Sequence, residues 1–117
     1  MKIREYRELK IWILGMSIVM DTYRLTKSFP KDELFGLTSQ MRRAAVSIPS
    51  NIAEGYNRHH TKEYIRYLYI ALGSCAELET QVEIATGLEY LDIKTRLELL
   101  ENINYETRMV RNLIKKL

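Results

Sequence analysis

A chain of 117 residues is long enough to build one hydrophobic core, and a hydrophobic content of 46% excludes an intrinsically disordered protein. The formal net charge of +3 is compatible with a nucleic-acid partner but is weaker than the basic signature of many such proteins. The single cysteine, Cys75, excludes an internal disulfide, and no run of about 18 uncharged residues predicts a membrane span. The charged first ten residues do not resemble a signal peptide, so we expect a cytoplasmic protein with no membrane partner.

The first predicted helix covers residues 6–27. Apolar side chains recur there at intervals of three and four between Leu9 and Tyr23, and we expect Trp12 to anchor the core. Gly15 lies inside this pattern, where glycine costs about 1 kcal/mol relative to alanine. A glycine at such a position predicts a close approach by a neighbouring helix.

The second predicted helix covers residues 35–57 and contains Pro49, which removes one backbone hydrogen bond. We expect this helix to be kinked at the proline but continuous. Its apolar residues fall on two sides, so it needs one partner inside the bundle and a second outside it. A predicted oligomer interface is made of outward apolar residues on this helix and the next, namely Val46, Ala53, Tyr56, Ile70 and Ile84.

Two further helices are predicted at residues 62–86 and 92–116. In each of them apolar residues recur at alternating intervals of four and three residues. Thr61 and Asp92 are the expected N-caps, and Gly87 is the expected C-cap of the third helix. Four amphipathic helices joined by short connections predict an all-α fold, an antiparallel up-down-up-down four-helix bundle that forms a single domain over residues 1–117.

The stretch Leu37–Gly55 (LTSQMRRAAVSIPSNIAEG) resembles the signature of the four-helix bundle family encoded in intervening sequences of bacterial 23S ribosomal RNA genes. Four other segments resemble the same family in the same order: Tyr6–Trp12 (YRELKIW), Thr26–Pro30 (TKSFP), Thr61–Leu78 (TKEYIRYLYIALGSCAEL) and Glu79–Leu91 (ETQVEIATGLEYL). The last predicted helix resembles the family in the spacing of its apolar residues more than in residue identity.

This resemblance implies a cytoplasmic bacterial protein whose helical bundle assembles into a homo-oligomer, a ring of five. It also implies no established enzymatic activity. A more remote likeness of fold connects it to an accessory protein of diversity-generating retroelements, a basic five-fold ring that binds nucleic acid. The family's biochemical role is poorly defined, so the resemblance predicts the fold more than the function.

Basic residues concentrate around the predicted connection between the second and third helices. The candidate nucleic-acid contacts in this cluster are Arg58, His59, His60, Lys62 and Arg66. Arg43 is a further candidate, because it shares a polar stripe of the second predicted helix with Arg58. Clustered positive charge binds phosphate by releasing counterions, and Tyr56, Tyr64 and Tyr67 could stack on bases. The alternative is a solvated loop with core tyrosines, and a second basic run in the final turns is already favoured by the helix dipole.

Glu79 falls within the apolar arc of the third predicted helix, where an unpaired buried carboxylate is costly. We therefore expect a buried polar network in which Arg42, Arg43 or Asn51 is its partner. An exposed Glu79 is the alternative, should the helix be rotated slightly.

No catalytic constellation, phosphate-binding loop or metal-ligand spacing is present, so we expect no cofactor, no metal and no small-molecule substrate. Cys75 lies on the core stripe and is expected to be inert. The sequence thus predicts a non-enzymatic homo-oligomer with RNA or DNA as partner. The alternative is a protein-binding adaptor that docks a partner helix and has no nucleic-acid role.

Overall fold

The computed structural model describes residues 5–117, which form four long α-helices and two short 3-10 helices. The α-helices are α1 (Lys10–Thr26), α2 (Leu37–Asn57), α3 (Thr61–Gly87) and α4 (Ile93–Lys116). The 3-10 helix η1 (Tyr6–Glu8) precedes α1, and η2 (Lys31–Glu33) lies in the connection between α1 and α2.

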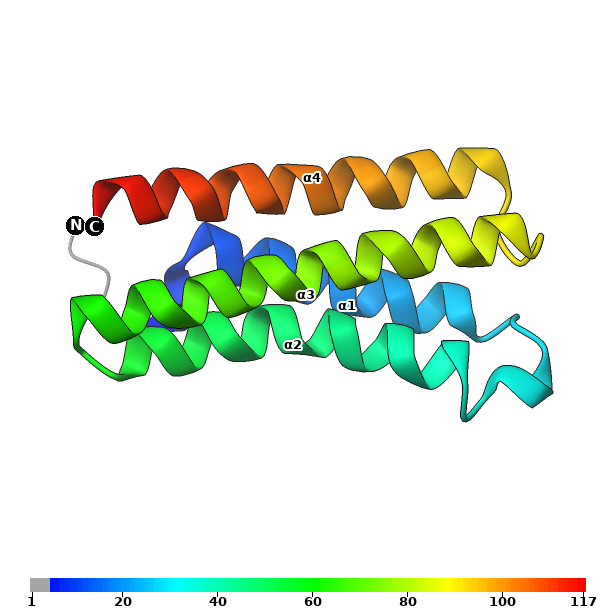
Figure 1. Ribbon diagram of the computed structural model, residues 1–117, viewed down its shortest axis with the longest axis horizontal. Coiled ribbons are helices and arrows are strands. Elements are labelled where there is room, and N and C mark those ends of the chain that lie inside the picture. The colour runs from blue at the N-terminus through cyan, green and yellow to red at the C-terminus, as the bar shows by residue number, and fades with distance from the viewer. Residues whose placement is uncertain (1–4) are drawn as a thin grey trace.

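The four helices pack side by side along a long axis of 44 Å (Figure 1). Helix α1 contacts α2 and α4, and α3 contacts the same two helices from the opposite corner. Short connections make successive helices run in opposite directions, as expected for an up-down bundle (Figure 1). The all-α prediction is confirmed, and each predicted helix has a counterpart in the structure.

The core consists of the apolar faces that the sequence pattern indicates. Its fully buried side chains come from all four helices and include Ile18, Met41, Ile48, Ile52, Leu68, Leu78, Val82, Ile103 and Val110. Burying one such side chain contributes roughly 1.5–3 kcal/mol to folding, so this shared core holds the four helices together.

Helix α2 is unbroken across Pro49, and the proline ring is buried. The predicted continuity of this helix is therefore confirmed. The predicted kink at the proline stays a prediction. The side chain of Asn51 donates to the carbonyl oxygen of Ser47 at 2.8 Å, and the Ser47 and Ser74 hydroxyls lie 2.7 Å apart. These short polar side chains link α2 to α3 within the chain.

The helix ends differ in detail from the sequence-based bounds. The predicted first helix is divided because Leu9 is extended (φ −73°, ψ 130°), which lets the ring of Tyr6 pack edge-on against Trp12 at 5.5 Å. Helix α3 begins at Thr61, so His60 rather than Thr61 is its N-cap. Asp92 is confirmed as a cap, since its side chain accepts a hydrogen bond from the Thr95 amide.

The expected glycine cap of α3 is corrected as well. The helix ends at Gly87, but the left-handed residue that turns the chain is Glu89, with φ 65°. The amide of Glu89 bonds the carbonyl of Thr86 at 3.0 Å, and that of Tyr90 bonds Ala85 at 2.8 Å. This is the hydrogen-bond pattern of a Schellman motif, built here around a glutamate.

Candidate nucleic-acid interface and apolar groove

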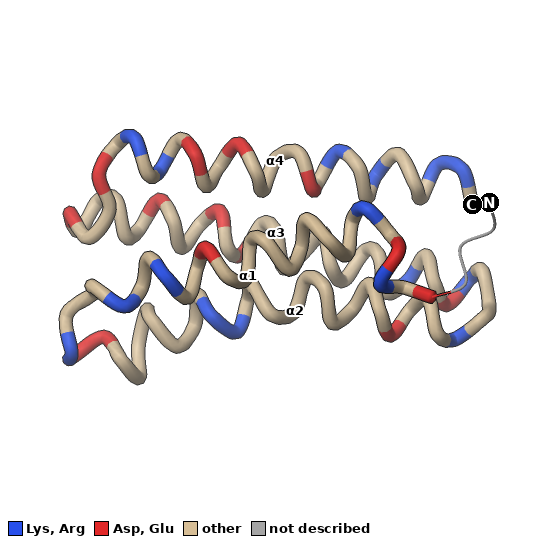
Figure 2. The backbone as a smooth tube through the Cα atoms, turned by 180° about the vertical axis from the view of Figure 1, so that it is seen from behind, with Lys and Arg blue, Asp and Glu red and all other residues tan. Residues whose placement is uncertain are grey.

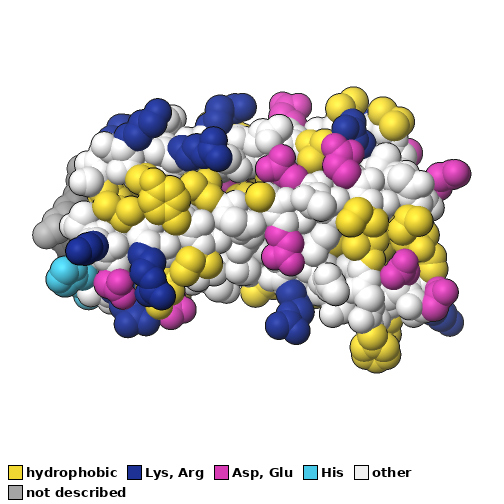
Figure 3. Space-filling model, viewed as in Figure 1, with side chains coloured by type: hydrophobic (Ala, Val, Ile, Leu, Met, Phe, Trp, Pro, Cys, Tyr) yellow, Lys and Arg dark blue, Asp and Glu magenta, His cyan; other side chains and the backbone are white. Residues whose placement is uncertain are grey.

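The fold brings two basic segments to the same end of the bundle. The connection between α2 and α3 carries Arg58, His59, His60 and Lys62, and the last turns of α4 carry Arg108, Arg111, Lys115 and Lys116. Because successive helices run in opposite directions, α2 and α4 run the same way, and both segments lie at the end where the C-terminus is found (Figures 1 and 2). Lys, Arg and His side chains gather over this end in the space-filling view (Figure 3).

Two of the predicted contact residues are already engaged by acidic neighbours. Arg58 lies 3.4 Å from a carboxylate oxygen of Glu54 and donates to the hydroxyl of Tyr67 at 2.8 Å. Arg66 lies 3.7 Å from Glu63 and stands over the ring of Tyr67. Both pairs are exposed, so each is worth little and leaves less free positive charge at this site.

Other cations at this end keep their charge free. In the described part of the chain, Lys62, Arg111, Lys115 and Lys116 have no carboxylate within 4 Å, and all four are exposed. His59 and His60 are exposed too, with His59 in the left-handed region at φ 54°. The free charge of the basic end therefore comes more from α4 than from the residues around the loop.

Arg43 does not belong to this cluster. It is exposed on α2, and at 1.5 Å per residue it lies roughly 22 Å along the helix from Arg58. Arg43 shares a polar stripe with Arg58, but this stripe runs along α2, so the two guanidinium groups are far apart.

The three tyrosines near the loop are held by protein contacts. The ring of Tyr64 packs edge-on against Tyr56 at 5.7 Å, and burial raises the pKa of Tyr64 to about 12. The hydroxyl of Tyr67 lies 3.1 Å from Glu54 and accepts from Arg58. Tyr64 is therefore a packing residue, in line with the alternative that the sequence left open.

The expected network of Arg42, Asn51 and Glu79 is not formed. The Nε atom of Arg42 donates to the hydroxyl of Thr26 at 2.9 Å, and its guanidinium stacks over the ring of Tyr23 at 4.7 Å. Asn51 donates to Ser47. Glu79 is only half-buried, and no ion pair or hydrogen bond to it is found among residues 5–117.

The buried carboxylate belongs instead to Glu106 on α4, whose exposed fraction is 0%. Neither carboxylate oxygen has a hydrogen-bond partner in the described structure, and burial raises the pKa of Glu106 to about 8. Sequence reasoning missed it, although the spacing Leu99, Ile103, Glu106, Val110 places it on the core stripe. A neutral, protonated side chain is the form that this site favours near neutral pH.

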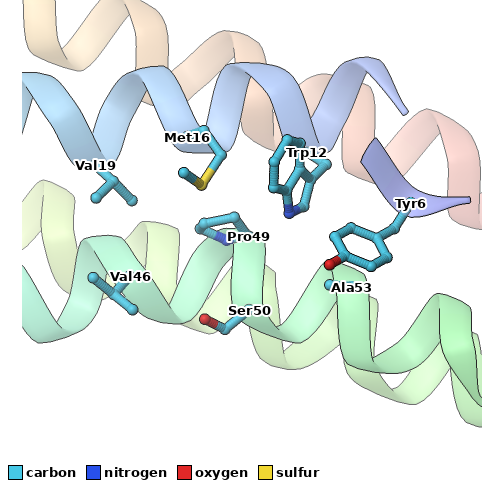
Figure 4. A pocket seen from close by; sticks show the side chains of 8 residues that line it. All are labelled: Tyr6, Trp12, Met16, Val19, Val46, Pro49, Ser50 and Ala53. Atoms are coloured by element: carbon cyan, nitrogen blue, oxygen red, sulfur yellow. The ribbon is translucent and has the colours of Figure 1, made fainter. Parts of the chain in front are cut away.

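A groove runs between α1 and α2 on the outer side of the bundle (Figure 4). It encloses about 300 Å³ and is lined by Tyr6, Trp12, Met16, Val19, Val46, Pro49, Ser50 and Ala53. Two of the predicted interface residues, Val46 and Ala53, therefore lie in its wall. Ile70 and Ile84 are on α3, with exposed fractions of 40% and 47%, and do not line this groove.

Other kinds of site find little support in the described part of the chain. No three His, Cys, Asp or Glu side chains come together there as metal ligands. Burial raises the pKa of the Cys75 thiol to about 12, so this sulfur is a packing atom rather than a nucleophile. None of the helices in residues 5–117 combines the length and apolarity that a membrane crossing requires.

These features define an all-α protein of four helices around one core, with a basic end and an apolar outer groove. The chain belongs to the 23S rRNA-intervening sequence protein family, whose model matches residues 7–112. The family resemblance seen in the sequence is thereby confirmed.

The fold is also that of a solved structure. A crystal structure of a protein of unknown function from the S23 ribosomal protein family of Bacteroides thetaiotaomicron has a TM-score of 0.80 to this chain. The two share 19% identity, and the alignment covers 90% of this chain and 98% of the other. No curated protein matches the chain.

Proposed function

We propose that this chain is a non-enzymatic homo-oligomeric module that binds RNA or DNA through the basic end of its bundle. The observation that carries the proposal is the meeting of two basic segments at one end, where Lys62, Arg111, Lys115 and Lys116 have free charge. Positive side chains held close together release counterions from a phosphate backbone, which is the main source of sequence-independent affinity.

Assembly strengthens this argument. A net charge of +3 on one chain gives a weak field, but copies arranged around an axis would place several basic ends side by side. On this proposal, a modestly basic protein acquires a strongly positive face through assembly. RNA and DNA share the phosphate chemistry that this face recognises.

The test is the salt dependence of binding to a labelled oligonucleotide, followed by fluorescence anisotropy. Wild-type protein should bind RNA or DNA at about 50 mM salt and lose most of that affinity by about 200 mM. Replacing Lys62, Arg111 and Lys115 together by glutamine should weaken binding about tenfold or more and make the salt slope shallower.

The matched control replaces three exposed lysines at the other end, Lys27, Lys31 and Lys94, by glutamine. It changes the net charge by the same amount, so it should leave binding nearly unchanged if the basic end is the site. Equal losses in the two variants would show that only overall charge matters and would overturn the proposed site. Absence of binding at low salt would overturn the nucleic-acid role and leave the adaptor alternative.

A further inference from the structure

The groove between α1 and α2 is a concave apolar surface open to solvent. Trp12 and Met16 approach it from α1, and Pro49 closes its floor from α2 (Figure 4). The apolar surface continues along α1 through Met20, which is 60% exposed. Such an exposed apolar surface is suited to contact with an apolar side chain of another molecule.

The connection between α1 and α2 carries two exposed apolar side chains. Phe35 is 93% exposed, far more than any other large hydrophobic residue among those described, and Leu34 beside it is 50% exposed. Packing an exposed aromatic ring against another molecule is strongly favourable, because aromatic side chains bury about 150–250 Å² each when they pack.

Hydrogen bonds tie down the backbone on either side of Phe35. The Glu33 carboxylate accepts from the backbone amide of Leu37 at 3.2 Å and from the hydroxyl of Tyr90 at 2.9 Å. The amide of Gly36 bonds the carbonyl of Glu33 at 2.9 Å. A backbone held in this way presents Phe35 to a partner without the entropy loss of ordering a loop.

Phe35 cannot reach the groove of its own chain. It precedes α2, whereas Pro49 lies roughly 18 Å further along that helix, beyond the reach of a side chain. We propose that Phe35 of one copy occupies the α1–α2 groove of a second copy. This inference rests on the homo-oligomer part of the proposed function and names the surfaces that would join the copies.

Charge supports the same pairing. The carboxylate of Asp32 is exposed near Phe35, and the guanidinium of Arg43 is exposed one turn before Val46 at the edge of the groove. Among the described residues neither side chain forms an ion pair within its own chain. Asp32 of one copy and Arg43 of the next are therefore the pair that we assign to an ion pair across the proposed contact.

A contact of this type is heterologous, since the two copies use different surfaces. Each pair of copies then has one free Phe35 and one free groove, so further copies can add at both ends. Closed rings and open filaments are the two forms that such a contact produces.

The chain contains two phenylalanines and one tryptophan, and each side of the proposed contact therefore has its own probe. Labelling with 4-fluorophenylalanine gives one ¹⁹F signal from Phe29, which is 6% exposed, and one from Phe35. With rising protein concentration the Phe35 signal should lose its solvent-isotope shift, while the Phe29 signal stays constant. The emission of Trp12 should shift to the blue over the same concentration range.

The decisive variant is Phe35→Ala, which is safe for folding because the side chain makes so little contact within its own chain. We expect it to weaken self-association at least about tenfold, measured by sedimentation, and to abolish the Trp12 shift. Ser50→Glu, which places a carboxylate in the apolar groove, should do the same from the other side. Tyr69→Ala removes another exposed aromatic, on α3, and should leave association unchanged.

The outcomes separate this inference from the broader proposal. An oligomer that persists in Phe35→Ala, or a Phe35 signal that stays solvent-exposed in the oligomer, overturns the Phe35 contact and leaves homo-oligomerisation standing. A wild-type protein that remains monomeric up to millimolar concentration overturns both. Nucleic-acid binding is measured separately and is decided by the variants of the basic end.

Discussion

Gly15 on α1 leaves room for the carboxylate of Glu106 on α4. A Cβ atom at position 15 would lie 3.0 Å from Oε2 of Glu106 and 3.4 Å from Cβ of Pro49. Three helices therefore meet at one glycine, around a carboxylate that is completely buried. The sequence prediction of a close helix approach at Gly15 is confirmed by this contact.

We expect Gly15→Ala to destabilise the protein although alanine is the better helix former. The helix-propensity gain is about 1 kcal/mol, but the methyl group overpacks a site that has no free space, at a loss of about 1–3 kcal/mol. Urea denaturation at fixed protein concentration measures the net change. Gly73→Ala is the control, because nothing lies within 4 Å of its Cβ position, and it should stabilise the protein. A Gly15→Ala variant as stable as Gly73→Ala would contradict the tight fit.

Gly55→Ala should be more damaging than Gly15→Ala. A Cβ atom at position 55 would lie 2.5 Å from the Cβ atom of Tyr67, a distance that requires α2 and α3 to move apart. Cβ atoms are fixed to the backbone, so no rotation of a side chain relieves this clash. We expect a loss of about 3 kcal/mol and a lower melting temperature, with the same Gly73→Ala control. Unchanged thermal unfolding would show that the two helices are less closely packed there.

Glu106 should make stability depend on pH in the direction opposite to that of a salt-bridged carboxylate. Burial raises its pKa from 4.5 to about 8, so between these values the folded state keeps a proton that the unfolded state has lost. Its contribution to stability is therefore complete below pH 4.5, decreases at up to about 1.4 kcal/mol per pH unit, and is gone above pH 8.

The variant Glu106→Gln removes this titration and should flatten the pH dependence of the free energy of unfolding. We expect it to be more stable than wild type at pH 9, where the wild-type carboxylate is charged. Glu98→Gln, an exposed carboxylate on the same helix, should keep the wild-type profile. A Glu106→Gln profile parallel to wild type between pH 5 and pH 9 would mean that Glu106 is hydrated or paired in solution.

Cys75 should react with a thiol reagent only when the protein unfolds. Its sulfur is fully buried, and burial raises its pKa to about 12, so neither access nor thiolate is available at neutral pH. The reaction rate should rise with urea in parallel with unfolding. Ser17→Cys, at an exposed position of α1, provides the fast-reacting control. Rapid labelling of Cys75 in native buffer would indicate local opening of the bundle.

The comparison of Glu79 with Glu106 shows why sequence periodicity located the core but chose the wrong carboxylate. A helical wheel gives the angle of a residue around its own helix. Whether that angle is buried depends on where the neighbouring helices lie. Glu79 sits at the edge of the buried face of α3, whereas Glu106 faces Gly15 of α1, a contact between residues far apart in the chain.

The basic residues give a second example. The sequence predicts Arg43 as a further contact because it shares a polar stripe of the second helix with Arg58. In the structure Arg58 and Arg66 are paired with carboxylates, Arg43 is remote, and the free charge comes largely from α4. Side-chain pairing and the meeting of distant segments depend on three-dimensional distance, which local spacing does not encode.

The sequence by itself determined the helices, their apolar faces, the Asp92 cap and the family. These follow from local hydrogen bonding, from the spacing of apolar residues and from the residue identities of the motif. Only the tertiary structure decided which polar groups are buried or paired, which cations remain free, and where a groove and an exposed aromatic ring are left. Those properties arise when four helices take fixed positions against one another, since burial and electrostatic pairing are determined by the atoms that surround a side chain rather than by its place in the chain.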